Sequence, residues 1–338
     1  MGVAAFEPGP DFEPAPGVPV ARVNTPVLGS SGMLCEVWRT SHAVETGVRG
    51  RIHYARAADM LFGCIILSES PAVSDSTAPP VAGQRTPLYE ATERVYREIF
   101  SALDVLGYPH LVRIWNYVPE INRDTQGIER YKQFNSARQS AMLAAQRPVT
   151  GNVAAACALG AAAGSPLVVY FLASHSAATA IENPRQVSAY HYPPQYGAHS
   201  PIFSRAAVHR EADGMTLFIS GTASIVGHQT LHEGDTAAQT RETLTNIEAL
   251  LEEANRVTGS TEFSLETLAC KVYVRNPSDL PVIQRELRAA LGSSARAVYL
   301  QADICRRDLS VEIEATVMVG TAAKDRATVR RSMAEHFF

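Results

Sequence analysis

Short apolar runs alternate with longer amphipathic stretches along most of this chain, so the two periodicities predict strands and helices in turn. The amphipathic stretches place apolar residues three and four positions apart, as at Ile247, Leu250, Leu251 and Ala254. The same order of strand, helix and strand occurs twice, in three matched pairs: Met60–Leu67 with Met215–Gly221, Tyr89–Leu106 with Thr240–Val257, and Leu111–Val118 with Leu268–Arg275. The pattern therefore predicts two copies of one unit.

This repeat predicts an α/β (α+β) fold with mixed sheets, each with helices packed on one face. Between the copies, Arg138–Ala163 is expected to form one or two helices, followed by a buried strand at Pro166–Leu172. Residues 1–30 are rich in Pro, Gly and Ala and lack periodicity, so we expect an extended N-terminal arm there. We expect one domain over residues 31–165, with a long loop at Ser68–Pro87, and a second domain over 166–338.

Two carboxylates alternate with two apolar residues near the end of the chain, in the order Val311, Glu312, Ile313 and Glu314. Side chains point to opposite faces along a strand, so both acids are expected on one face and the apolar pair on the other. Such a face is often a solvated sheet surface. A carboxylate held in a pocket there would instead be a proton donor or acceptor, and a second carboxylate in the same pocket would raise one pKa.

Composition narrows the classes of function. The chain has 338 residues, 46% of them hydrophobic, and a net charge of -4 with scattered basic residues, so nucleic-acid and membrane surfaces are disfavoured. The longest apolar run, Val153–Ala163, is too short to span a bilayer, and no basic segment followed by an apolar one begins the chain. Five widely spaced cysteines form no C-x-x-C pair, and the histidines show no metal-ligand spacing. We expect a cytoplasmic protein with free thiols, no metal and a small-molecule substrate.

The second copy resembles the RidA/YjgF family. The resemblance lies in Pro201–Ala206, the Ser220-Gly221 turn, the Asn246-Ile247 helix, the Val272–Val274 strand and the closing Glu312–Ala315 strand. From about residue 30 onward the whole chain resembles a chorismatase, with a degenerate first copy. The segments that carry this second resemblance are Arg113–Asn122, Arg130–Asn135 and Tyr190–Tyr196. Chorismatases release pyruvate from the enolpyruvyl ether of chorismate, and RidA relatives bind their ligand between the units of a trimer. The resemblance therefore implies either a monomer with an internal site or a trimer.

The resemblance also implies site residues. Glu312 matches the site Glu of RidA relatives and is expected to be the general acid, with Glu314 the less favoured candidate. Arg205 and, after a shift of one residue, Arg296 are expected to bind the two substrate carboxylates, since arginine offers forked donors. Considered alone, the arginines would be read as surface or loop-anchoring residues.

The aromatic block and the Ser-Gly turn supply further candidates for the pocket wall. Tyr192 and Tyr196 are expected to line the substrate pocket, although a loop packed on the core explains them equally well. Gly221 and Ala223, at the turn, are also expected to contact substrate.

Cys305 lies seven residues before Glu312, which resembles the 3-hydroxybenzoate-forming subtype of chorismatase. Its side chain would exclude the hydrolytic water, whereas a lone cysteine is ordinarily a small buried hydrophobe. Ala223 corresponds to the other subtype, which hydrolyses chorismate, if it is the position at which the two subtypes differ.

The expected function is release of pyruvate and 3-hydroxybenzoate from chorismate, with no cofactor. Three alternatives stay open. They are hydrolysis to pyruvate and trans-3,4-dihydroxycyclohexa-1,5-diene carboxylate, a RidA-type imine deaminase, and a non-catalytic ligand-binding relative.

Overall fold

The computed structural model describes residues 1–9, 11–30, 32–69, 85–212, 214–293, 295–320 and 327–331. Its first large sheet has the strand order β11-β8-β12-β7-β6-β5 and is antiparallel except for the pair β11 and β8. The strands of this sheet are β5 (Glu45–Arg49), β6 (Ile52–Ala57), β7 (Met60–Leu67), β8 (His110–Pro119), β11 (Ala155–Ala161) and β12 (Leu167–Ser174). Helices α1 (Pro87–Leu106) and α2 (Arg130–Ala144) belong to the same half of the chain.

The second large sheet repeats this order as β19-β18-β20-β15-β14-β13, with β3 added beyond β19. Here too one pair, β18 and β19, is parallel. The strands of this sheet are β3 (Val27–Leu28), β13 (Thr179–Ile181), β14 (Ala206–Glu211), β15 (Gly214–Thr222), β18 (Ala269–Val274), β19 (Arg296–Gln301) and β20 (Val311–Gly320). Helices α3 (Thr236–Thr258) and α4 (Leu280–Leu291) belong with it.

All three matched pairs of the sequence repeat occupy equivalent places. β7 and β15, α1 and α3, and β8 and β18 correspond in order and direction, so the predicted duplication is confirmed. The strand expected at Pro166–Leu172 is β12, which pairs with both β7 and β8 and is thus the counterpart of β20. The division into domains stays a prediction, but a boundary drawn from the sheets would fall after β12 rather than before it.

A smaller sheet lies beside the two large ones, in the order β2-β1-β4-β21. Its strands are β1 (Gly2–Phe6), β2 (Val20–Val23), β4 (Leu34–Trp38) and β21 (Ala327–Arg331). Two short hairpins lie outside these sheets: β9 (Asp124–Thr125) pairs with β10 (Ile128–Glu129), and β16 (Ile225–Val226) pairs with β17 (Gln229–Thr230). The segment expected to be an extended arm therefore contains β1, β2 and β3. Its apolar residues, Phe6 among them, are buried against the large sheets.

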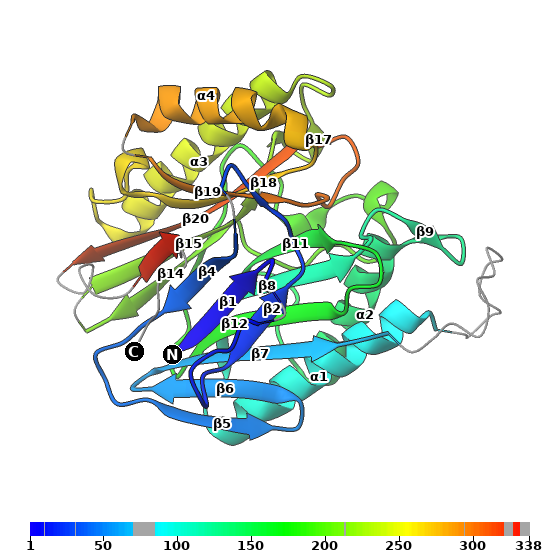
Figure 1. Ribbon diagram of the computed structural model, residues 1–338. Helices are drawn as coiled ribbons and strands as arrows, with labels where there is room; N and C mark the ends of the chain where they lie inside the picture. The colour runs from blue at the N-terminus through cyan, green and yellow to red at the C-terminus, as the bar shows by residue number, and fades with distance from the viewer. Residues whose placement is uncertain are drawn as a thin grey trace.

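Helices cover the outer faces and leave the inner faces of the sheets to pack together, as Figure 1 shows with α3 and α4 on one side and α1 and α2 on the other. One apolar cluster joins α1 and α2 to the first sheet, a second joins α3 and α4 to the second sheet, and a third fills the space between sheets. Burial of these faces is the main driving force for the fold. No helix in the described part of the chain is both long and apolar enough to cross a membrane.

The long helices begin and end where the sequence supplies caps. The Thr86 hydroxyl accepts from the backbone nitrogen of Tyr89 at the start of α1, and Gly107 closes that helix at φ 80°. Asp235 caps α3 in the same way through Ala238, and Gly259 ends it at φ 71°. These signals explain why the two helices of the predicted repeat agree with α1 and α3 to within a few residues.

The expectation of one or two helices over Arg138–Ala163 is wrong beyond Ala144. α2 ends at Ala144, and Ala155–Ala161 forms strand β11, which is parallel to β8. Alanine favours helices, but small side chains also allow a strand to pack closely between two covered faces, and this tertiary packing overrides the propensity. Most of the loop expected at Ser68–Pro87 lies outside the described residues.

Candidate active site

Glu312 lies on β20 directly beside an irregularity in the neighbouring strand. The pairing of β15 with β20 shifts register between Ile219 and Thr222, so the backbone of Ser220 and Gly221 bulges opposite the two carboxylates. Bulges re-aim side chains and are common next to active sites. The predicted alternation also holds, because Val311 and Ile313 lie in the apolar cluster beneath α3 and α4.

Gly221 is required by the close approach of this bulge to the acid. A Cβ built at Gly221 would lie 2.0 Å from Glu312 Oε1 and 3.2 Å from the Cβ of Cys157. Only a residue without a side chain leaves the Glu312 carboxylate in its place. The Ser-Gly turn recognised in the sequence therefore shapes the floor of the site.

Glu312 is 3% exposed, and its side chain lines a pocket of about 410 Å³. Burial, reinforced by the charge of Glu314, raises the pKa of Glu312 to about 8, although Arg113 and Arg275 oppose the shift. Glu312 is therefore mainly protonated at neutral pH. A buried acid that keeps its proton at pH 7 can serve as a proton donor.

Cys305 lies within reach of this acid. Its sulfur is 3.9 Å from Glu312 Oε2, close enough for a weak S–H···O hydrogen bond. Burial raises the pKa of the thiol to about 12, and the charge of Glu312 adds to the shift. Cys305 therefore stays a neutral thiol rather than a thiolate nucleophile. It lies in the loop after β19, four residues beyond the end of that strand at Gln301.

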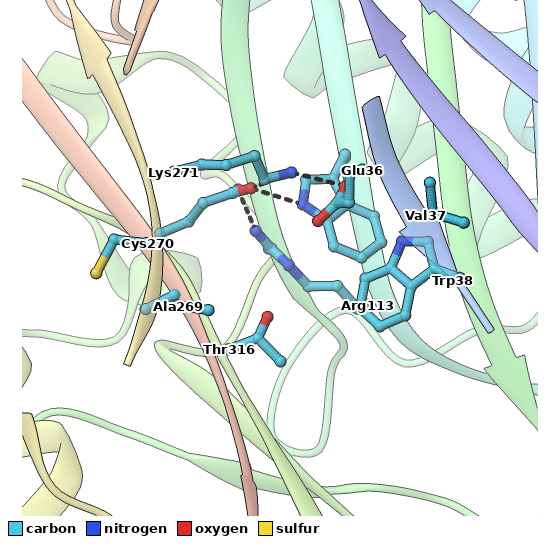
Figure 2. Close-up of a pocket in the computed structure, with 11 residues that line it drawn as sticks. Glu36, Val37, Trp38, Arg113, Ala269, Cys270, Lys271 and Thr316 are labelled. Atoms are coloured by element: carbon cyan, nitrogen blue, oxygen red, sulfur yellow. Dashed lines mark hydrogen bonds and ion pairs between the residues drawn. The ribbon is translucent and has the colours of Figure 1, made fainter. Parts of the chain in front are cut away.

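Glu314 has a different environment two residues along the same strand. Figure 2 shows Lys271, Glu36 and Arg113 close together, and the Glu314 carboxylate accepts from Lys271 Nζ at 2.6 Å and from Arg113 Nη2 at 2.5 Å. Trp115 donates its indole N–H to the same carboxylate at 2.9 Å. Burial by itself would raise the pKa of Glu314, but Lys271 and Arg113 outweigh it and lower the pKa.

Glu36 completes this group by accepting from Lys271 Nζ at 3.0 Å. We call Glu36, Arg113, Lys271 and Glu314 the buried quartet. Its two positive and two negative side chains come from β4, β8, β18 and β20, and thus from all three sheets. The quartet therefore joins the sheets and holds Glu314 ionised, while Glu312 faces the pocket uncharged.

The pocket wall opposite Glu312 is aromatic and cationic. Arg205 is 4% exposed and donates to the Tyr192 hydroxyl at 2.7 Å and to the Val187 carbonyl at 2.8 Å. Arg306 stacks on Tyr196, with its Cζ 4.1 Å from the ring centroid, and also lies over Tyr192 at 5.2 Å. Neither arginine has a carboxylate partner within salt-bridge distance in the described part of the chain, so both cations remain available to an anion in the pocket.

Two residues of α3 lie behind this wall, and one of them, Asn246, belongs to the Asn246-Ile247 motif of the sequence. Gln239 on α3 accepts from the backbone nitrogen of Ser310 at 2.8 Å and donates to the Asp308 carbonyl at 2.8 Å, which fixes the loop that carries Cys305. Asn246 donates to the carbonyls of Ala223 and Ile225 at 3.0 and 2.9 Å. These helix residues therefore position the pocket walls without lining the pocket.

Most of the residues that sequence reasoning selected meet in this pocket. They are Glu312, Cys305, Arg205, Tyr192, Tyr196, Gly221 and Ala223. Arg296 lies elsewhere, at the exposed start of β19, where it donates to the Thr267 carbonyl at 2.6 Å. It pairs with Ala269, whereas Glu312 pairs with Tyr273 at the other end of β18. The one-residue shift in its match to the RidA pattern leaves it outside the pocket.

Other pocket residues were missed by sequence reasoning. Arg306 follows Cys305 directly, and Tyr131, Lys132 and Arg307 add aromatic and positive groups to the lining. The sequence could have indicated Arg306, because it lies between two residues already selected, Cys305 and Glu312. Tyr131 comes from the other half of the chain, so only the folded arrangement brings it to Glu312.

Comparison with known proteins agrees with this arrangement. A family model described as chorismatase FkbO/Hyg5-like, N-terminal, matches residues 36–173. A 3-hydroxybenzoate synthase of Streptomyces hygroscopicus is 38% identical over 89% of this chain and 86% of its own length, and a chorismatase of the same organism is 35% identical over 89% and 84%. A chorismatase crystal structure superposes with a TM-score of 0.81 at 34% identity, covering 94% of this chain and 92% of that one. The chain belongs to the chorismatase family.

Proposed function

We propose that this protein cleaves the enolpyruvyl ether of chorismate and releases pyruvate and 3-hydroxybenzoate. The observation that carries the proposal is Glu312, a buried carboxylic acid in a pocket that Arg205 and Arg306 also line, where burial raises its pKa to about 8. The curated relatives with similar sequences are a 3-hydroxybenzoate synthase and chorismatases, and their names agree with this chemistry.

The reaction begins with transfer of the Glu312 proton to the terminal methylene carbon of the enol ether. The ether carbon becomes an oxocarbenium-like centre, and the bond between the ring carbon and the ether oxygen breaks with both electrons staying on oxygen, which gives pyruvate. As this bond to ring carbon C3 breaks, the oxygen of the neighbouring C4 hydroxyl bonds to C3 and gives up its proton, which forms a 3,4-epoxide. The epoxide takes up a proton on oxygen and opens at its C4–O bond, and loss of the C3 proton then gives aromatic 3-hydroxybenzoate. Return of a proton to Glu312 restores the acid, so no change in redox state occurs. General acid catalysis of this kind contributes roughly 10²–10⁴-fold to a rate.

Chorismate is a dianion, and the pocket supplies two cations positioned by aromatic rings. Arg205 and Arg306 each offer forked donors that suit a carboxylate, and their contacts with Tyr192 and Tyr196 restrict the side chains before substrate binds. We therefore assign Arg306, rather than the distant Arg296, to the second substrate carboxylate. Tyr192 and Tyr196 also present ring faces to the cyclohexadiene.

Cys305 favours the aromatic product over the hydrolytic one. A neutral thiol 3.9 Å from Glu312 Oε2 occupies space beside the acid that a water molecule would otherwise fill. Hydrolysis consumes one water molecule, whereas pyruvate and 3-hydroxybenzoate together contain the same atoms as chorismate. Ala223 lines the same pocket, and it points to the hydrolytic subtype if it is the position at which the subtypes differ.

The test is to incubate the purified protein with chorismate and to follow pyruvate together with the ring product by chromatography and ultraviolet absorbance. We expect pyruvate and 3-hydroxybenzoate in equal amounts. Pyruvate with a non-aromatic dihydroxy-diene would keep the reaction class and overturn the product assignment. Folded protein that releases no pyruvate would exclude chorismate cleavage and favour imine deamination or ligand binding alone.

The role of Cys305 is tested by Cys305→Ala and Cys305→Ser in the same assay. Removing the thiol opens room for water, so Cys305→Ala is expected to convert part of the product to the dihydroxy-diene while pyruvate release continues. Cys305→Ser keeps a side chain of similar size and should retain more of the aromatic product. An unchanged product ratio in both variants would show that Cys305 does not direct the outcome.

A further inference from the structure

The loop that carries Cys305 is held by an arginine outside the pocket. Arg275 directly follows the last residue of β18, and its backbone nitrogen donates to the Ser310 carbonyl at 3.0 Å. Its side chain is 17% exposed and contacts the loop between residues 303 and 309. Arg275 does not line the pocket, whereas Cys305 and Arg306 of this loop do. Its hydrogen bonds therefore reach the reaction only through the loop.

All five N–H groups of the Arg275 guanidinium have an acceptor among the described residues. Nε donates to the Leu309 carbonyl at 2.7 Å, and Nη2 donates to the carbonyls of Ile304 and Arg306 at 3.2 and 2.7 Å. Nη1 donates to Asp303 Oδ1 at 2.6 Å and to Asn122 Oδ1 at 3.1 Å. Arginine is the only side chain that offers five donors in a fixed fork. The arrangement therefore uses the shape of the side chain as well as its charge.

Two of these contacts lie on either side of Cys305. The carbonyls of Ile304 and Arg306 belong to the residues directly before and after it, so fixing both restricts the main chain at Cys305. In this arrangement the Cys305 sulfur lies 3.9 Å from Glu312 Oε2. If the two bonds to Arg275 were lost, the thiol would be free to move away from the acid, and a water molecule would have room there.

The same loop is also fixed to the first half of the chain. Asn122, which accepts from Arg275, lies shortly after β8 and is 9% exposed, and its carbonyl accepts from Arg307 Nη2. The backbone nitrogen of Gly160 on β11 donates to the Asp303 carbonyl at 2.7 Å. A Cβ at Gly160 would lie 2.5 Å from the Cβ of Asp303, so only glycine permits this close approach. Both halves of the chain therefore hold the loop in place.

We propose that Arg275 is a positioning residue that favours 3-hydroxybenzoate over the hydrolytic product: it holds the main chain on both sides of Cys305, so the thiol stays beside Glu312 where a water molecule would otherwise enter. The inference deepens the proposed function and rests on it, since it requires that the two outcomes compete in this pocket. Hydrolysis adds a water molecule to the oxocarbenium-like carbon, whereas the route to 3-hydroxybenzoate adds none.

The experiment measures the two ring products that Arg275→Lys makes from chorismate. Burial raises the pKa of Glu312 and the charge of Arg275 opposes the rise, so lysine keeps that charge while it offers only three donors on one nitrogen. A misplacement of about 1 Å can change a rate by up to about 100-fold. We expect the ratio of dihydroxy-diene to 3-hydroxybenzoate to rise about tenfold, while pyruvate release continues.

Arg147→Lys is the matched control. The Arg147 side chain is also 17% exposed and donates to the Pro109 carbonyl and to Asp104, but it follows α2 and lies outside the Cys305 loop. Both lysine variants should lower the Tm by a few degrees, because each loses hydrogen bonds, but only Arg275→Lys should change the product ratio.

Two further variants sharpen the test. Arg275→Lys combined with Cys305→Ala should give the product ratio of Cys305→Ala within about twofold, because no thiol is left to position. If Arg275→Lys does not fold, Asn122→Ala takes its place. It removes one of the five acceptors and should raise the diene ratio by about threefold.

The possible outcomes are distinct. A folded Arg275→Lys with the product ratio of the wild type would overturn the inference and leave the proposed function intact. An equal change of ratio in Arg147→Lys would assign the effect to lower stability and would also overturn it, as would a combined variant whose ratio rises by the product of the two single effects. Wild type that releases no pyruvate would remove the proposed function and the inference together.

Discussion

The central strands β12 and β20 occupy equivalent places in the two sheets, but only β20 carries acids on its inner face. Tyr170 lies opposite Trp115 in the first sheet, as Glu312 lies opposite Tyr273 in the second. One pair further along, Leu172 lies opposite Arg113 in the first sheet, and Glu314 lies opposite Lys271 in the second. In the first sheet these positions complete a core, whereas in the second they hold a proton donor and the ion pairs beside it.

The neighbouring strands differ in the same way. β7 pairs with β12 without a register shift, whereas β15 bulges beside Glu312 at Ser220 and Gly221. The two copies share one topology, but the inward residues of β12 pack into a core, whereas β20 borders a pocket. The difference arises from the bulge in β15 and from the two acidic side chains of β20. The comparison teaches that the first sheet acts as the rigid wall against which the second sheet builds its site, and it supplies Arg113 and Trp115 to hold Glu314.

Substituting the inward residues of the two strands should give the largest difference. Glu312→Gln removes the acidic proton but keeps the shape, and we expect kcat for pyruvate release to fall roughly 1,000-fold. Tyr170→Phe is the matched change in β12. It loses hydroxyl contacts with Glu36 and Lys271, both at 2.9 Å, and should cost about 1–2 kcal/mol of stability with activity within a few-fold.

Steady-state kinetics and urea unfolding of both variants test this contrast. If Glu312→Gln released pyruvate at a rate near that of the wild type, another group would have to be the acid. If Tyr170→Phe lost activity as severely as Glu312→Gln, the two copies would not differ in function as proposed.

Glu314→Gln should affect stability most. It leaves Arg113 and Lys271 buried with only Glu36 as a counter-charge, and breaking a buried pair in this way costs about 3–5 kcal/mol. The loss would appear in the free energy of unfolding measured with urea. Leu172, a buried residue of β12 in the apolar cluster between the sheets, provides a control. Leu172→Met keeps the volume and should change stability by less than about 1.5 kcal/mol.

The same variant reports on the acid two residues away. The charge of Glu314 raises the pKa of Glu312, so its removal should move the loss of activity at high pH to a lower pH. A pH profile that did not move would mean that burial alone keeps the proton on Glu312.

The sequence predicted the repeated elements and most of the pocket because those features depend on local pattern. The alternation of apolar and acidic residues predicted that Glu312 and Glu314 share one face of a strand. The helical spacing of apolar residues predicted where the helices of the repeat lie. The separate environments of the two acids could not be predicted, since Arg113 is 201 positions away from Glu314 in the sequence. Arg296 matched the family pattern only after a shift, and its strand position takes it away from the pocket.

Gly221→Ala tests the bulge that β7 lacks. The new Cβ would meet Glu312 Oε1 at 2.0 Å, so the carboxylate must move and kcat should fall by roughly 100-fold. Ala55→Gly, in β6 of the first sheet, changes a buried alanine away from the pocket and should lower stability by about 1 kcal/mol without altering kcat. Normal turnover in Gly221→Ala would show that the acid tolerates displacement.

A further difference between the two strands is a pH-dependent change in stability. The pKa of Glu312 is raised from 4.5 to about 8 in the folded protein, so its contribution is fully present below pH 4.5 and is lost as pH rises through 8. Glu312→Gln cannot ionise. Its Tm should equal that of the wild type near pH 4.5 and exceed it by several degrees above pH 8, whereas Tyr170→Phe should show a constant difference over this range. A Tm difference for Glu312→Gln that does not grow with pH would mean that Glu312 is ionised at neutral pH, and the acid would then have to be sought elsewhere in the pocket.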